Sequence, residues 1–341
     1  MTAGACILGC AGLALSPGEA AFYREVQPWG FILFRRNVDT PDQVRALTSA
    51  LRATVDRADA PVLIDQEGGR VQRLGPPHWR RYPPGRAYGQ ISANDPLIRR
   101  EITRLGARLM AHDLAGLGIN VDCLPVLDVP DPHGHEVIGD RAYGDTPDEV
   151  ALLGRAAAEG LIAGGVLPMI KHIPGHGRAQ ADSHLNLPVV DASAADLDAR
   201  DFAPFRALSD MPMAMTAHVV YSALDARRPA TTSRAVIKHT IRDAIGFDGL
   251  LVSDDLSMKA LSGDFTRRAR ASLAAGCDVV LHCNGDMAEM RAVVAGTKAL
   301  TGRAAARAAA ALARLPRMAE PFDVEAARAR FDAAFEGRWA A

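Results

Sequence analysis

Residues 166–177 have the sequence VLPMIKHIPGHG. The first five are continuously apolar, and the run then gives way to Lys171 and His172 and to a turn rich in proline and glycine. A short run without polar alternation is typical of a parallel strand that helices cover on both faces of the sheet. The polar residues that follow it would lie at the carboxyl end of that strand.

Seven further runs share this apolar character, and longer helical patterns follow most of them. They are Ala5–Leu15, Gly30–Phe34, Pro61–Ile64, Ile119–Leu127, Met213–Val220, Gly249–Val252 and Asp278–His282. Eight alternating units favour an α/β fold with a single closed (β/α)8 TIM-type barrel, although the pattern alone leaves an open doubly wound sheet possible. The sequence lacks GxGxxG after the first run and lacks GxxxxGK[ST], so dinucleotide and P-loop sites have no anchor.

Four stretches have helix signals between these runs. Thr-Pro pairs at residues 40–41 and 146–147 place an N-cap and a first-turn proline at two helix starts. Residues 99–117 and 233–245 have the spacing of amphipathic helices. The Ala/Arg-rich residues from about 302 to 314 predict a solvated helix, and we expect residues 1–341 to form one catalytic domain with a helical tail from about 302 to 341.

Composition excludes several classes of partner. Apolar residues make up 48% of the 341-residue chain, and 39 basic against 40 acidic residues give a formal net charge of −1. Such a balance provides no electrostatic reason to bind nucleic acid or an anionic membrane. The aromatic content of 5% disfavours a groove that stacks bases, and no apolar run approaches 18 residues.

The apolar start and the cysteines bear on the compartment. No Lys or Arg precedes the apolar residues 4–15, since the first basic residue is Arg24, so we expect a first strand and not a signal peptide. The five cysteines are odd in number and form no CxxC pair. They are typical of small core residues in a reducing compartment, and cytoplasmic localisation follows as the expectation.

Ionisable residues lie at or after the ends of six of the eight apolar runs. They are Asp65 to Arg73, Asp128 with Gly139 to Arg141, Lys171 to Gly177 with Asp182 to His184, Thr216 to His218, Ser253 to Asp255, and His282 to Asn284. In a barrel these positions meet at one end, where chemistry is usually located. A purely structural barrel would not need so many ionisable groups there, since each costs desolvation unless it is paired.

Each group also has a structural interpretation when it is taken alone. Asp254 and Asp255 could cap the next helix, and Lys171 and His172 could form a core ion pair with Asp128. The histidines after the fifth run match no HExxH pattern and no closed tetrahedral set, so we expect no metal site. The weight lies in the combination of groups.

Four motifs, taken in this order, resemble those of family 3 glycoside hydrolases, and within them the bacterial β-N-acetylglucosaminidases (β-hexosaminidases) of peptidoglycan recycling. They are DQEGGRVQR at 65–73, IGDR at 138–141, KHIPGHG at 171–177 with DSH at 182–184, and SDDLSM at 253–258. The resemblance extends from the first apolar run to the eighth. One departure is Arg178-Ala179-Gln180-Ala181, where many members have a more acidic linker.

The resemblance implies a role for eight residues. Asp254 matches the catalytic nucleophile, His184 an unusual general acid/base and Asp182 its partner. Five others match residues that hold the N-acetylglucosamine ring and its neighbour, namely Asp65, Arg73, Arg141, Lys171 and His172. The implied enzyme acts without cofactor or metal, as a monomer, on muropeptide fragments, and it binds neither nucleic acid nor membrane.

These residue types suit retaining glycoside hydrolysis. A carboxylate such as that of Asp254 can attack the anomeric carbon and leave again in a second step. Imidazole, with an unperturbed pKa of about 6.5, can give and take a proton near neutral pH. Asp182 and His184 are two residues apart, so in an extended segment they point to the same side and the carboxylate can orient the ring. Arginine would also suit a carboxylate on the aglycone, such as the lactyl group of muramic acid.

Other functions remain open at this stage. Adjacent Asp254 and Asp255 could instead assist attack by the substrate's own acetamido group. A histidine acid/base could serve a phosphorylase, because neutral imidazole repels phosphate less than a carboxylate does. A non-catalytic sugar sensor and a zinc amidohydrolase are the remaining alternatives. For the segment 174–181 we expect a mobile loop with Gly175 and Gly177 as hinge, because it has few apolar residues.

Overall fold

The computed structural model of the chain describes residues 2–91, 95–180, 183, 186–316 and 318–339. Within them, eight parallel strands close into a barrel in the order β1-β12-β11-β9-β7-β6-β3-β2. They are β1 (Gly4–Leu8), β2 (Pro28–Leu33), β3 (Val62–Ile64), β6 (Val121–Asp122), β7 (Leu167–Ile173), β9 (Met213–Thr216), β11 (Leu250–Asp255) and β12 (Val279–His282). Each predicted apolar run supplies one strand, so the TIM-type barrel is confirmed over the open sheet.

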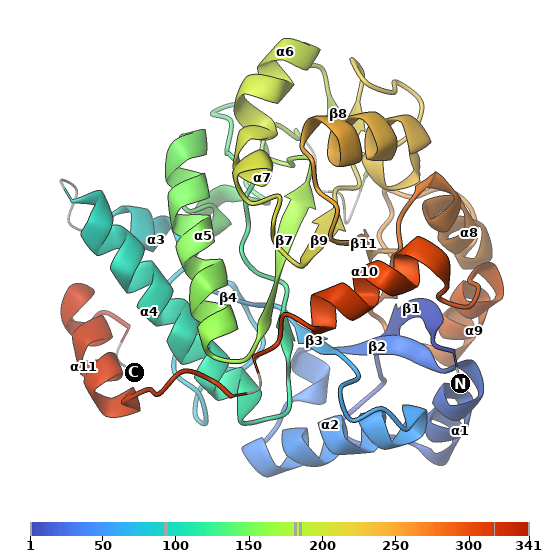
Figure 1. The fold of residues 1–341 in the computed structure, drawn as a ribbon, viewed down its shortest axis with the longest axis horizontal. Helices are drawn as coiled ribbons and strands as arrows, with labels where there is room; N and C mark the ends of the chain where they lie inside the picture. The colour runs from blue at the N-terminus through green and yellow to red at the C-terminus, as the bar shows by residue number, and fades with distance from the viewer. Residues whose placement is uncertain (1, 92–94, 181–182, 184–185, 317, 340–341) are drawn as a thin grey trace.

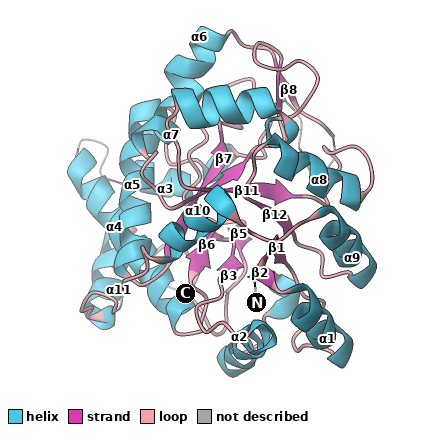
Figure 2. Ribbon diagram, turned by 45° about the vertical axis from the view of Figure 1, so that its right-hand side comes forward, coloured by secondary structure: helices cyan, strands magenta, loops and turns pink. Residues whose placement is uncertain are grey.

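Helices surround the central strands (Figure 2). They are α1 (Pro17–Val26), α2 (Pro41–Val55), α4 (Pro96–Ala115), α5 (Pro147–Ala163), the π-type η5 (Val236–Ala244), α8 (Phe265–Ala275) and α9 (Met287–Gly296). Shorter pieces, α6 (Ala194–Asp196), the π-type η3 (Leu197–Asp201) and α7 (Ala203–Ala207), connect β7 to β9, and α3 (Gly85–Gly89) precedes α4.

Side-chain caps fix several helix starts. The hydroxyls of Thr40 and Thr146 accept the backbone N–H three residues later, both at 3.3 Å, as the Thr-Pro signals predicted. The helix predicted from residue 99 begins three residues earlier, because the carboxylate of Asp95 caps it ahead of Pro96. The helix expected over 233–245 also forms, with the hydroxyl of Ser233 accepting from the backbone of Val236.

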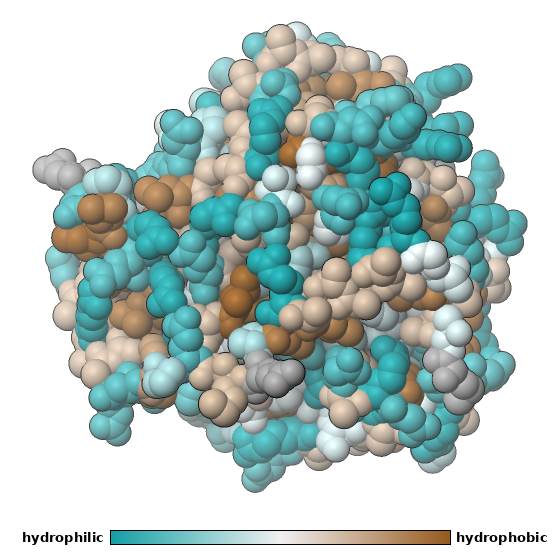
Figure 3. Space-filling model, viewed as in Figure 1, coloured by the Kyte–Doolittle hydropathy of each residue, from teal (hydrophilic) through white to brown (hydrophobic). Residues whose placement is uncertain are grey.

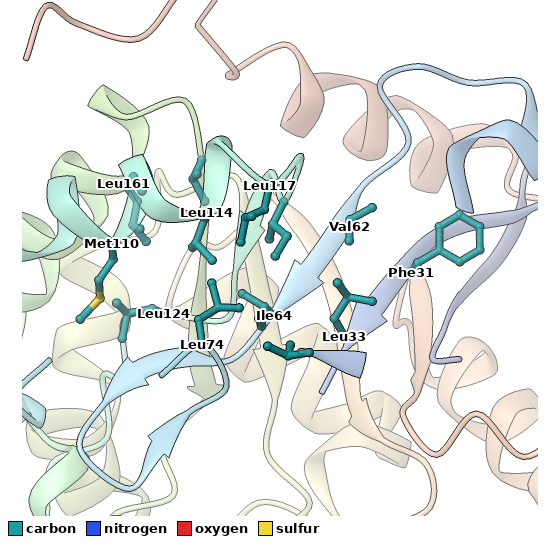
Figure 4. Close-up of a cluster of buried hydrophobic side chains, with 14 of the residues drawn as sticks. Phe31, Leu33, Val62, Ile64, Leu74, Met110, Leu114, Leu117, Leu124 and Leu161 are labelled. Atoms are coloured by element: carbon teal, nitrogen blue, oxygen red, sulfur yellow. The ribbon is translucent and has the colours of Figure 1, made fainter. Parts of the chain in front are cut away.

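Apolar side chains of the described residues are buried in four clusters, two of which form layers on the strands β2 and β3. One layer fills the space between β2, β3 and the helices α4 and α5, where Figure 4 shows interdigitated aliphatic side chains. Its labelled members are Phe31, Leu33, Val62, Ile64, Leu74, Met110, Leu114, Leu117, Leu124 and Leu161. The second layer includes alternate residues of the strands, such as Ile7, Leu63, Met169 and Val252, all buried. All five cysteines are free and buried, as expected for core residues.

The C-terminal helices pack on the barrel. In α10 (Gly302–Leu312), Ala308 and Ala311 are only 3% and 2% exposed and pack in the same apolar cluster as Trp29 and Met213. The predicted helix is thus confirmed, and its other residues are exposed or half-buried, but this face is not solvated because small alanines allow close approach to the barrel. Polar side chains surround the paler, alanine-rich α10 in the view of Figure 3. The last helix, α11 (Val324–Ala334), lies beside α4 (Figure 1).

Two small sheets that the sequence patterns did not predict lie outside the barrel. A hairpin of β4 (Gln66–Gly68) and β5 (Val71–Gln72) follows β3, and β8 (Val189–Val190) pairs in parallel with β10 (Val220–Tyr221). The 3-10 helix η2 (Gly139–Arg141) lies between β6 and α5. Among the described residues, no helix is long and apolar enough to cross a membrane.

Candidate active site

A pocket of about 280 Å³ lies where the strands end. Six of the eight predicted site residues line it together, and they come from β7, β11 and the loops after β3 and β6: Asp65, Arg73, Arg141, Lys171, His172 and Asp254. The other two, Asp182 and His184, lie outside the described residues. The barrel thus brings together residues that are up to 189 positions apart, from Asp65 to Asp254.

Lys171 is the centre of a charge network in this pocket. Its Nζ lies 2.9 Å from Asp65 Oδ1 and 2.6 Å from Glu67 Oε1. Glu67 also accepts two hydrogen bonds from Arg141, at 2.7 and 2.8 Å, and Asp65 accepts one from Arg73 at 2.9 Å. Two carboxylates therefore alternate with three cations, and no charge in the set lacks an opposite neighbour.

These contacts keep the network ionised. Burial opposes the charged form of Glu67, but Arg141 and Lys171 outweigh it and lower the pKa to about 2. Burial also opposes the charge of Asp65, yet Lys171 and Arg73 hold its pKa well below the usual range. Likewise the two carboxylates raise the pKa of Lys171 against its burial. A fixed array of charged donors and acceptors suits a small ligand rich in hydroxyls.

The β4–β5 hairpin turns Arg73 back toward Asp65. The side chain of Gln66 accepts the backbone N–H groups of Arg73 and Leu74, both at 3.0 Å, and so closes the hairpin. Gly68 has φ +91°, and a Cβ there would overlap the carbonyl oxygen of Pro83. The glycine pair at 68–69 is therefore required by the turn that brings the two charged side chains together.

Arg70 braces the loop that carries Arg141. Its Nε donates to Asp140 at 3.0 Å, and its Nη2 donates to the carbonyl oxygens of residues 136–138 at 2.7, 2.9 and 3.2 Å. These bonds fix the approach to η2, from which Arg141 reaches Glu67. Arg70 thus supports the site, although it does not line the pocket.

Asp128 organises the segment at the end of β7. Its carboxylate lies 2.7 Å from His172 Nδ1 and accepts the backbone N–H groups of His172 and His176 at 3.2 and 2.6 Å. Burial opposes its charge, but His172 outweighs burial and lowers the pKa of Asp128. The predicted pairing with Asp128 is thus confirmed for His172, whereas Lys171 pairs with Asp65 and Glu67 instead.

The segment 174–179 is mostly buried, and backbone hydrogen bonds tie it to a neighbouring loop. The carbonyl oxygens of Gly177 and Ala179 accept the N–H groups of Asp131 and His135, at 3.1 and 2.7 Å. The expectation of a weakly bonded loop is therefore wrong for these residues. The apolar content of the segment is low, but its backbone is satisfied by the β6 loop, which the sequence does not reveal.

The two predicted hinge glycines are closely packed. A Cβ at Gly177 would overlap the carbonyl oxygen of Val129, and a Cβ at Gly175 would lie 3.0 Å from the side chain of Asp201. Both glycines allow close approach of two segments, which is a second reason for glycine at these positions, and their role as a hinge stays a prediction. Of the predicted mobile segment 174–181, residue 181 lies outside the described residues.

Asp254 and Asp255 end β11 in different surroundings. The carboxylate of Asp255 accepts the backbone N–H groups of Ser257 and Cys283, at 3.0 and 3.2 Å, and so fastens the strand end to the loop after β12. Asp254 lines the pocket, and its Oδ1 accepts the N–H of Asp255 at 2.8 Å. Helix capping by either residue is a wrong interpretation, because Asp264 caps α8.

Three buried residues of the site region were not assigned a role from the sequence. They are Glu67, His176 and His218, ionisable residues at or after the ends of apolar runs. Their position near strand ends was visible, but their hydrogen-bond partners come from other segments of the chain. Within the part of the chain that the structure describes, no group of three or more His, Cys, Asp or Glu side chains could hold a metal ion.

Comparison with known proteins identifies the family. The profile described as "Glycosyl hydrolase family 3 N terminal domain" matches residues 24–318. A curated β-hexosaminidase of Methylococcus capsulatus is 42% identical over 277 residues, which cover 80% of each chain. The crystal structure of native NagZ from Neisseria gonorrhoeae superposes with a TM-score of 0.85 at 33% identity, covering 100% of this chain and 98% of that one. The same protein in complex with N-trifluoroacetyl-D-glucosamine gives 0.85 and 33%, with coverage of 100% and 99%. The chain therefore belongs to glycosyl hydrolase family 3, and it is a glycoside hydrolase built on a TIM-type barrel.

Proposed function

We propose that this chain is a retaining exo-β-N-acetylglucosaminidase that removes non-reducing terminal β-linked N-acetylglucosamine. The observation that carries the proposal is one pocket in which Asp254 accompanies the charged network around Lys171. The pocket is small enough to suit a single sugar ring, which fits removal of a terminal residue. The names of the relatives, β-hexosaminidase and NagZ, and the glucosamine derivative bound to the latter support the choice of sugar.

Five residues would hold the sugar. Asp65 can accept hydrogen bonds from two hydroxyls, while Arg73 and Lys171 donate. The side chains of Asp65 and Arg73 are 14% and 24% exposed, so they remain accessible to a ligand, whereas Lys171 is only 3% exposed and lies beneath them. Arg141 and His172 line the same pocket and would donate to further oxygens.

Hydrolysis would proceed in two steps, formation of a glycosyl-enzyme and its hydrolysis, both carried out by side chains of this protein. A carboxylate oxygen of Asp254 attacks the anomeric carbon as the bond to the leaving oxygen breaks, and His184 gives that oxygen its proton. Neutral His184 then takes a proton from water, whose oxygen attacks the anomeric carbon and releases Asp254. Asp182 would orient the imidazole and stabilise its charged form.

The natural substrate is proposed to be a muropeptide, GlcNAc-1,6-anhydro-MurNAc with or without its peptide, released during peptidoglycan recycling. This part of the proposal rests on the motifs that resemble the enzymes of that process. We further propose that residues 1–341 act as a monomeric, single catalytic domain in the cytoplasm, where free thiols persist. The five free cysteines and the packing of α10 and α11 on the barrel and α4 are consistent with this.

The proposal is tested by measuring hydrolysis of a chromogenic β-N-acetylglucosaminide with and without phosphate. The products are identified by mass spectrometry. We expect N-acetylglucosamine under both conditions, and the same product from GlcNAc-1,6-anhydro-MurNAc. A sugar phosphate formed only with phosphate would identify a phosphorylase. Binding of the sugar without any turnover would identify a sensor, and either outcome would overturn the proposal.

A further inference from the structure

His218 is a fully buried histidine next to the proposed nucleophile, and the chemistry above does not use it. It follows β9 in the stretch Thr216-Ala217-His218 and is 0% exposed. Its Nε2 lies 3.0 Å from the backbone carbonyl oxygen of Asp255, and its Nδ1 lies 2.7 Å from the hydroxyl of Thr231. Both ring nitrogens are therefore engaged inside the protein.

These partners define the proton positions on the ring. Burial lowers the pKa of His218 although Asp254 and Asp255 act in the opposite direction, so the ring is neutral and carries one N–H. The carbonyl oxygen of Asp255 can only accept, so Nε2 donates to it and Nδ1 must accept from the hydroxyl of Thr231. That hydroxyl has one proton, so in this arrangement it does not also donate to the carbonyl oxygen of Ala217, which lies 3.1 Å away. The hydroxyl of Thr216, 2.7 Å from that of Thr231, can donate into the same chain.

The chain of hydrogen bonds ends at Asp254. Asp255 is held by its carbonyl oxygen at His218 and by its carboxylate at the loop after β12, and its N–H donates to Asp254 Oδ1 at 2.8 Å. Because that N–H and that carbonyl belong to one residue, fixing the carbonyl restricts the backbone rotation that would carry the N–H away from Asp254. A neutral ring does this without placing a cation beside the carboxylate and weakening it as a nucleophile.

We propose that His218 is a positioning residue for Asp254: acting through the backbone of Asp255, and itself held in one tautomer by Thr231, it fixes the carboxylate in the orientation needed for attack. The inference rests on the proposed role of Asp254 as nucleophile. His218 itself touches no substrate in this arrangement. Its loss should slow formation of the glycosyl-enzyme and leave sugar binding nearly unchanged, since the binding network around Lys171 is built separately.

Three variants separate positioning from packing. His218→Leu fills the space but removes both hydrogen bonds, and His218→Gln can restore a donor at the place of Nε2. Thr231→Val removes only the hydroxyl that fixes the tautomer and keeps the shape. Thr54→Val, in α2, is the matched control, because its buried hydroxyl donates to Leu51 far from the pocket.

The readouts are kcat, KM and the rate at which a 2-fluoro glycosyl donor labels Asp254. We expect His218→Leu to lower kcat and labelling by on the order of 100-fold with KM within about threefold, since misplacement of a reacting group acts on the transition state. The kcat of His218→Gln should be at least about tenfold higher than that of His218→Leu. Thr231→Val should lower kcat by about five- to tenfold, and Thr54→Val should leave it unchanged.

Other outcomes are decisive. Equal losses in His218→Leu and His218→Gln, or a loss confined to KM, would show that His218 only fills space. If His218→Leu does not fold, an unchanged Thr231→Val enzyme overturns the proposal on its own. Failure of the proposed function is seen separately, because wild-type protein would then not acquire the label on Asp254.

Discussion

Glu67 and Arg141 form a two-pronged ion pair, with Oε2 2.7 Å from Nε and Oε1 2.8 Å from Nη2. The side chains are 3% and 11% exposed, and Oε1 is also 2.6 Å from Lys171 Nζ. One buried carboxylate therefore orients two cations, one from η2 and one from β7. Glu67 supports the proposed sugar-binding residues although it does not need to touch the sugar itself.

Replacing Glu67 with Gln should weaken sugar binding. The amide keeps the shape of the side chain but has no negative charge. Arg141 and Lys171 would then lose a buried anionic partner. We expect KM to rise at least about tenfold and the free energy of unfolding to fall by about 3 kcal/mol, the scale for breaking a buried pair. Steady-state kinetics and urea unfolding measure both quantities.

Glu101→Gln is the matched control for that substitution, because it makes the same change at an exposed ion pair. Glu101 pairs with Arg330, and both side chains are 55% exposed, so the loss should be at most about 1 kcal/mol with KM unchanged. If Glu67→Gln behaved like this control, Glu67 would not be the support of the binding residues.

Asp254→Ala should abolish glycosyl transfer, because it removes the carboxylate to which attack on the anomeric carbon is assigned. We expect a loss of several orders of magnitude, about 10⁴-fold or more in kcat, as for removal of a nucleophile that acts with its partners. A 2-fluoro glycosyl donor should label Asp254 in the wild type. Label on Asp255, or tight binding of a thiazoline analogue without any adduct, would contradict the assignment and point to attack by the substrate's acetamido group.

His184→Ala should harm substrates with poor leaving groups much more than nitrophenyl substrates, which need little protonation as they depart. Asp182→Asn should keep the fold, lower the rate and shift the pH–rate profile, because the imidazolium loses its partner. The measurement is kcat/KM across aglycones of increasing pKa. Equal losses on good and poor leaving groups would argue against an acid role for His184.

The positions of the eight barrel strands along the chain were predictable because the barrel repeats one pattern. Each apolar run from residue 5 to residue 282 became one barrel strand, and the threonines at 40 and 146 cap helices as expected. These features depend on local sequence and on burial of continuous apolar runs. The burial of one face of the alanine-rich α10 was missed because exposure depends on what a helix packs against, and the cluster that covers this face includes strand residues such as Met213 and Leu250.

The chemistry of the site was predictable only up to the residue types. Motifs identified Asp65, Lys171 and Asp254 as neighbours, and these do line one pocket. The sequence could not show that Glu67 links Lys171 to Arg141, because the three residues come from three separate elements, β4, β7 and η2. Nor could it show that Gly177 packs against the β6 loop, since a glycine in a polar segment is equally consistent with freedom and with close approach.

Gly177→Ala should disrupt the site. The new Cβ would overlap the carbonyl oxygen of Val129, which is backbone and cannot turn aside. We expect a loss of stability of about 2 kcal/mol or more together with a large loss of kcat, since forced overlap in a packed region shifts the backbone. Gly12→Ala, where nothing lies within 4 Å of the added carbon, is the control and should change neither quantity. Normal stability with reduced turnover in Gly177→Ala would instead support the predicted hinge.

His176 should make the protein less stable in mild acid. Burial, followed by the neighbouring His172, lowers its pKa from 6.5 to about 4. Between those two values the unfolded chain binds a proton that the native state does not, so the free energy of unfolding falls as the pH falls through this window. From pH 7 to pH 5 this one residue should account for a loss of about 2 kcal/mol. Urea unfolding of wild type and His176→Gln at both pH values measures the difference, and the variant should lack that part of the pH dependence whatever its absolute stability. His239→Gln, at a side chain 66% exposed, should keep the wild-type dependence. An identical dependence in wild type and His176→Gln would mean that His176 titrates normally in the folded protein and that its burial beside His172 carries no such cost.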